Sequence, residues 1–201
     1  RELMPDVAAL IELGLHHEQQ HQELLLTDIK YILGNNPLAP DYDPIRVSAI
    51  DLTAEHDGTC PPLDDWLDVP AAMVQIGHVG PGFAFDHESP PHPVRVPATQ
   101  PRRALVTNAE YLAFIQSGGY ERHEFWHSDG WDWVQSLPQK APLYWHPSPD
   151  DSAQWLHFTL TGVQPLPATA PVTHLSYFEA HAFCQWAGWR LPTEFEWEVG
   201  A

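Results

Sequence analysis

The chain has 201 residues, of which 43% are apolar, with nine Trp and eight Phe, so the composition predicts a packed core and excludes general disorder. Nine Lys and Arg against 27 Asp and Glu give a formal net charge of −18, which argues against nucleic acid and anionic membrane surfaces as partners. No apolar run reaches the roughly 20 residues of a membrane span, and two cysteines without a CxxC pair favour a reducing, cytoplasmic compartment.

The first predicted element is a long helix over residues 6–33. Its apolar residues recur at helical spacing, Asp6 offers an N-cap, and Gly34 begins a strong helix stop that ends at Pro37. At about 1.5 Å per residue the helix is roughly 40 Å long, which is typical of a helical bundle. No second helix of that length is predicted, so we expect its bundle partners to precede residue 1 and the helix to be packed only in part.

Short elements separated by turns are predicted after this helix. Residues 37–64 are rich in Pro among Asp, Ser and Thr, which is a linker composition. Short apolar stretches bounded by Gly and Pro then predict strands at 73–76, 83–85, 94–96 and 156–160. The fold class is therefore α+β, with a loop-rich domain whose Trp side chains fill the core.

Three further helices are predicted from their capping residues. They are 108–116 after the N-cap Thr107, 177–186 after Ser176 with Glu179 at N3, and a last helix after Thr193 with Glu196 at N3. The last helix reaches Ala201 without a C-cap, and the first begins almost at Arg1. We expect the chain to be a fragment cut within structure at both ends.

The sharpest chemical feature is the pair His17 and His21. Residues four apart lie one above the other on a helix, so the two imidazoles can point at one metal ion. Gln20 borders this face and could contact something bound at the metal, whereas His16 lies about 100° away and is expected to be a packing or surface residue. A helix whose histidines are merely hydrogen-bonded within a bundle is the alternative.

The same residues also fit the H-E-x-x-H pattern of zinc metalloproteases, with Glu18 as general base. The extended form of that pattern needs Gly and His after the second histidine, where this chain has Leu24 and Thr27. A glutamate ligand on a following helix is the other possibility, but the Pro-rich segment follows instead. The protease interpretation is therefore disfavoured.

Residues 17–30 (HEQQHQELLLTDIK) resemble the metal helix in the DinB-like bundle of EgtB-type ergothioneine-pathway sulfoxide synthases. Later motifs resemble the formylglycine-generating-enzyme-like (sulfatase-modifying factor, C-type-lectin-like) domain of the same enzymes: GFAFDHESPPH at 82–92, VTNAEY at 106–111, GGY at 118–120, DGW at 129–131, PVTHLSYFEA at 171–180 and WAGWRLPTE at 186–194. The two motif sets in this order are more specific than either set alone.

The resemblance implies three units along the chain. Residues 1–36 are the last helix of a truncated DinB-like metal-binding bundle, residues 37–64 are the linker, and residues 65–201 are a C-terminally truncated sulfatase-modifying-factor-like domain. It also implies a non-haem iron oxidoreductase of the hercynine oxygenase type, which uses O2 to join γ-glutamylcysteine or cysteine to hercynine as a sulfoxide in ergothioneine biosynthesis.

The resemblance further implies Fe(II) as the cofactor, with His17 and His21 as two of three histidine ligands and Gln20 near the hercynine imidazole. The third ligand, the thiol-binding arginines and the catalytic Tyr are expected outside the chain, the Tyr beyond Ala201. No catalytic residue is therefore expected within it, and the chain is expected to be inactive alone. A related selenoneine-type synthase and a non-catalytic lectin-like binding module stay open as alternatives.

Two other features are expected to be structural. Asp86, His87, Glu88 and His92 could form a second metal cluster, but the resemblance gives them a hydrogen-bonding role in a loop; His87 stands where the resembling sequences usually have Asn. Cys184 lies within a predicted helix beside large apolar residues and is expected to be buried filler rather than a nucleophile.

Overall fold

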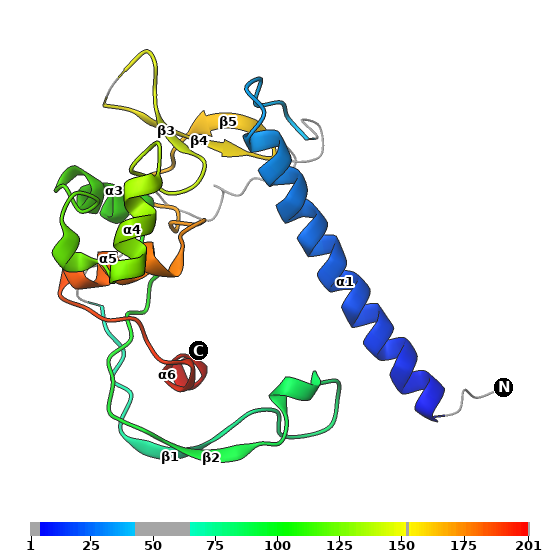
Figure 1. Ribbon diagram of the computed structural model, residues 1–201. Coiled ribbons are helices and arrows are strands. Elements are labelled where there is room, and N and C mark those ends of the chain that lie inside the picture. The colour runs from blue at the N-terminus through cyan, green and yellow to red at the C-terminus, as the bar shows by residue number, and fades with distance from the viewer. Residues whose placement is uncertain (1–4, 43–64, 152, 201) are drawn as a thin grey trace.

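The computed structural model describes residues 5–42, 65–151 and 153–200, and it shows one long helix beside a loop-rich α+β domain (Figure 1). The helix α1 runs unbroken over Pro5–Gly34 and confirms the predicted long helix. It begins before Asp6, which therefore lies inside the helix instead of capping it. Residues 43–64 of the predicted linker lie outside the described residues. Among the described helices, none combines the length and the apolar character needed to cross a membrane.

The strands form two small antiparallel sheets. In the first, β1 (Ala72–Ile76) pairs with β2 (His92–Val96). In the second, β4 (Trp155–Thr159) lies between β3 (Trp145–Pro147) and β5 (Gly162–Pro165). The strands predicted at 73–76, 94–96 and 156–160 are confirmed, whereas the three-residue β3 and the four-residue β5 have no prediction.

The predicted strand at 83–85 is wrong. These residues are coil and lead into the 3-10 turn η1 (Asp86–Glu88). The reason is local: the backbone N–H of Phe85 donates to the carboxylate of Glu88 at 2.7 Å and is not available to a neighbouring strand. Phe83 to Phe85 thus form part of the loop that joins β1 to β2.

The predicted caps are present on α3 (Asn108–Gln116), α5 (Tyr177–Ala187) and α6 (Glu194–Gly200). Each is a two-way capping box, in which the N-cap hydroxyl accepts from the N3 backbone and the N3 carboxylate accepts from the N-cap backbone. Arg190 also donates to the carboxylate of Glu196 at 2.6 and 2.7 Å. The helix α4 (Ser128–Ser136) is not predicted by the sequence, because its N-cap His127 makes no side-chain cap. The short turn η2 (His123–Phe125) precedes it.

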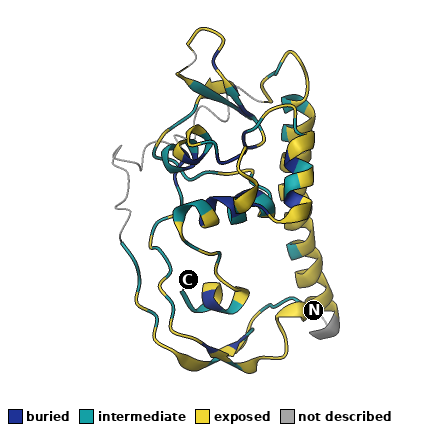
Figure 2. Ribbon diagram, turned by 60° about the vertical axis from the view of Figure 1, so that its left-hand side comes forward, coloured by how far each residue is buried: buried dark blue, intermediate teal, exposed yellow. Residues whose placement is uncertain are grey.

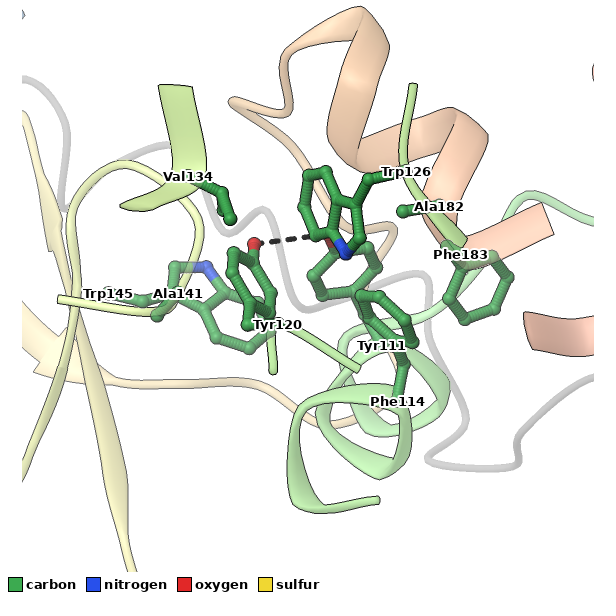
Figure 3. Packing of buried hydrophobic residues seen from close by; sticks show 9 residues of the cluster. All are labelled: Tyr111, Phe114, Tyr120, Trp126, Val134, Ala141, Trp145, Ala182 and Phe183. Carbon is green, nitrogen blue, oxygen red and sulfur yellow. Dashed lines mark hydrogen bonds between the residues drawn. The ribbon is translucent and has the colours of Figure 1, made fainter. Parts of the chain in front are cut away.

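The core is an aromatic cluster between α3, α4 and α5 (Figure 3). Phe183 of α5 stacks on Tyr111 of α3 with ring centroids 5.4 Å apart. The buried members are Tyr111, Phe114, Tyr120, Trp126, Val134, Ala141, Trp145, Ala182 and Phe183. Other Trp side chains pack against this cluster half-buried, so they fill the space between loops as expected.

The helix α1 is exposed along most of its length (Figure 2). Leu10, Leu25 and Ile32 keep 68%, 64% and 62% of their surface exposed. The expectation of a partly packed helix is confirmed. The position of the helix relative to the domain therefore depends on a few contacts.

Candidate functional site

His17 and His21 lie side by side on α1. Their ring centroids are 4.5 Å apart with the planes at 72°, so both rings are on the same side of the helix, as predicted. Both side chains are exposed. Across residues 5–42, 65–151 and 153–200 there is no group of three or more His, Cys, Asp and Glu arranged for a metal ion. The pair can therefore supply two ligands of a site, and its metal-binding role stays a prediction.

Gln20 and His16 share the adjacent stripe of the helix, because residues four apart align. His16 is half-buried and its ring stacks on Phe83, with centroids 4.0 Å apart and an interplanar angle of 16°. The expected packing role of His16 is confirmed. Gln20 is exposed one turn further on, and its contact with a substrate stays a prediction.

The loop after β1 holds the second group of candidate metal ligands. Glu88 accepts the N–H of Phe85, and the carboxylate of Asp86 accepts the N–H of His87 at 2.9 Å. Nδ1 of His92 lies 3.3 Å from the carbonyl of Pro90. These contacts give the loop its shape, in line with the structural role expected of these residues.

A cleft of about 1580 Å3 lies between residues 66–70, residues 98–106 and the segment that leads into α6. Residues of α1 do not line it, so it is distinct from the histidine pair. Cys184 does line it, but the side chain is buried and burial raises the pKa of the thiol. The thiol is thus kept protonated, which fits filler better than a nucleophile.

The C-terminal end of α1 is attached to the domain by contacts that no pattern in the sequence predicts. Nζ of Lys30 lies 2.7 Å from Nε2 of His174 and 4.9 Å from the ring centroid of Tyr144. Gly34 lies so close that an added Cβ would approach the Tyr144 ring to 2.8 Å. Partial burial beside the Lys30 ammonium lowers the pKa of His174 to about 4, so the imidazole is neutral and can accept from Lys30.

The described residues thus define a loop-rich α+β domain preceded by a long helix that carries a histidine pair. The chain belongs to the sulfatase-modifying factor enzyme 1-like domain family, whose family model matches residues 57–201.

Three relatives show how far the similarity extends. A protein from Mycolicibacterium thermoresistibile named hercynine oxygenase is 34% identical over 197 residues, which are 97% of this chain and 41% of that protein. The hercynine oxygenase of Mycobacterium tuberculosis is 43% identical over 115 residues, 57% of this chain and 26% of that protein. The formylglycine-generating enzyme of Bos taurus is 32% identical over 156 residues, 68% of this chain and 39% of that enzyme.

The chain spans at most about two fifths of the length of these relatives. Because the match to the Mycolicibacterium protein takes in 97% of the chain, it includes the helix with His17 and His21 as well as the domain. The similarity to hercynine oxygenases therefore covers both units, in the same order.

Proposed function

We propose that this chain is part of an iron(II)- and O2-dependent sulfoxide synthase that joins γ-glutamylcysteine or cysteine to hercynine. The observation that carries the proposal is the imidazole pair, with ring centroids 4.5 Å apart on a helix that is matched, together with the domain, to a hercynine oxygenase. In this proposal α1 is the last helix of a DinB-like bundle, and its exposed Leu and Ile side chains pack against the other helices.

The donor set fits iron(II). Imidazole nitrogen is a ligand that ferrous iron accepts readily in non-haem sites. His17 and His21 would hold the metal, and iron when bound supplies the redox chemistry that O2-dependent C–S bond formation requires. Gln20 lies one residue before His21, and its amide can both donate to and accept from the imidazole of hercynine. Orienting the substrate ring is the task that this chain contributes beyond metal binding.

Metal affinity tests the histidine pair directly. Anaerobic titration of the chain with Fe(II), or with Co(II) as a spectroscopic substitute, should give binding that either His17→Ala or His21→Ala weakens by about tenfold or more, or about 1.4 kcal/mol. His16→Phe is the matched control, because it keeps a ring stacked on Phe83 and removes only the nitrogens. Metal binding weakened equally in His16→Phe, or unchanged in both His17→Ala and His21→Ala, would count against the metal site and favour a non-catalytic binding module.

Product mass tests the reaction. Hercynine and O2 are supplied with γ-glutamylcysteine, cysteine or a seleno-sugar, and the mass of the product identifies the donor. Since the chain spans about two fifths of its relatives, we expect turnover to need segments that correspond to their remaining length. Robust turnover by the 201 residues alone would contradict that expectation.

A further inference from the structure

The helix α1 contacts the domain at two separated places. At its C-terminal end, Lys30 reaches His174 and Tyr144. Near its middle, His16 stacks on Phe83 of the β1–β2 loop. Figure 2 shows this loop reaching toward the N-terminal half of the helix, while Figure 1 places the other end beside β4 and β5.

The two contacts lie on one face of the helix. His16 and Lys30 are fourteen residues apart, which is close to four complete turns at 3.6 residues per turn. His17 lies about 100° around the helix from His16. The face held by the domain and the face that carries the histidine pair are therefore adjacent, and rotation of the helix would move the pair around its axis.

The β1–β2 loop is built to hold the Phe83 ring in place. Phe83 is half-buried, and its ring meets that of Phe85 edge-on at a centroid distance of 4.8 Å. Phe85 in turn stacks on His87 at 5.7 Å. The loop is tied to α6 as well, because the N–H of Gly77 donates to Glu198 at 3.0 Å. The Phe83 ring is thus backed by Phe85 in a loop that is itself bonded to α6, and so it can resist movement of the helix.

We propose that Phe83 is a positioning residue: by stacking on His16 it fixes the tilt and rotation of α1, and thereby the place of His17 and His21 relative to the domain. This inference rests on the proposed function. It assigns to the loop a role in the metal site although no loop residue is a ligand.

The length of the helix shows why a second attachment matters. Residue 17 lies thirteen residues, or about 20 Å, from the Lys30 attachment. A pivot of about 10° there would displace His17 by about 3 Å, which exceeds a metal–imidazole bond of about 2 Å. A second contact one residue from His17 therefore limits this pivot in a way that the attachment at Lys30 and Gly34 does not.

NMR of the 201-residue chain tests this positioning without any assay of activity. A nuclear Overhauser contact between the rings of His16 and Phe83 is expected in the unmodified chain. Copper(II) is then added as a paramagnetic probe, since it binds imidazoles most strongly among the divalent first-row metals. Copper bound at the pair should broaden the amide signals of residues 82–88. His17→Ala should abolish this broadening, which assigns it to the pair.

The variants separate positioning from binding. Phe83→Leu should lose the loop broadening while the copper affinity stays the same, and Phe83→Tyr should restore it. Unchanged broadening in Phe83→Leu would overturn the inference. If copper does not bind in a manner that depends on His17, the proposed function fails, and the contact between the rings still decides whether Phe83 positions the helix: its absence in the unmodified chain overturns that role.

Discussion

Replacing Tyr120 by Phe removes the central hydroxyl of a buried hydrogen-bond chain. The hydroxyl of Tyr120 donates to Glu179 at 2.6 Å and lies 3.1 Å from the hydroxyl of Tyr111. Tyr111, Tyr120 and Glu179 are 0%, 2% and 3% exposed, so water does not reach these groups. Burial raises the pKa of Glu179 and that of Tyr120.

The expected loss follows from what remains unpaired. Glu179 keeps the bond from the N–H of Ser176 at 2.7 Å, but its other oxygen loses its donor. A buried group left without its partner costs about 1–3 kcal/mol, and more when it is charged, so we expect Tyr120→Phe to lower the free energy of unfolding by about 2–3 kcal/mol. Tyr111→Phe is the matched control: it removes the end of the chain and leaves the carboxylate paired, at an expected cost of about 1 kcal/mol.

Urea unfolding followed by tryptophan fluorescence measures the free energy of unfolding of both variants. The slope of this free energy against urea concentration should be the same in the variants and the unmodified chain. The double variant Tyr120→Phe/Glu179→Gln should lose less than the sum of its single changes, because both act on one bond. If Tyr120→Phe is no less stable than Tyr111→Phe, the hydrogen bond from Tyr120 to the Glu179 carboxylate does not make the stabilising contribution assigned to it.

Three other changes have predicted outcomes. Gly119→Ala places a methyl into the Phe114 ring and should cost about 1–3 kcal/mol in urea unfolding. Gly14→Ala is the control: it has open space around it inside α1 and should stabilise the helix by up to about 1 kcal/mol. Hydrogen bonds from the guanidinium of Arg190 lower the pKa of Glu196 to about 2. The contribution of Glu196 to stability is therefore complete above pH 4.5 and is lost as the pH falls towards 2. Glu196→Gln should have a lower free energy of unfolding at pH 7 and should lose less of it on acidification. The pKa of His174 is lowered to about 4 from 6.5, so its contribution favours the folded state above pH 6.5 and is lost as the pH falls from 6.5 towards 4. In His174→Asn, which suits the positive φ of 61°, this loss should disappear. Hydrogen exchange of the α1 backbone amides, measured between pH 6.5 and 4, should then depend less on pH than in the unmodified chain.

The elements that could be predicted from the sequence are those whose causes are local. The capping boxes at Thr107, Ser176 and Thr193 each need a residue and its third neighbour, and all three are present. Local signals fail where tertiary contacts decide: α4 has no side-chain cap, and β3 exists because it pairs with β4. The residues at 83–85 have the composition of a strand, but a carboxylate three residues later captures the backbone donor.

The candidate site divides in the same way. The four-residue spacing of His17 and His21 predicts neighbouring rings on any helix, and the rings are neighbours. The contacts that attach the helix cannot be predicted from spacing, since Lys30 and His174 are 144 residues apart and the sequence at 83–85, where His16 contacts Phe83, predicts a strand and not a loop.

The spacing of the two histidines and the direction in which they point therefore have different origins in this chain. The spacing of the two histidines comes from α1 itself and would be the same in an isolated helix of this sequence. The direction in which they point depends on where the domain contacts that helix. On a helix without contacts to the domain, the histidine pair could still bind a metal weakly, but the position of the metal relative to the rest of the protein would not be fixed. Two contacts fourteen residues apart limit both tilt and rotation. The loop at 82–88 and the end of α1 at Gly34 should consequently tolerate substitution less well than the exposed Leu and Ile positions of the helix, although the histidine pair lies on neither of them.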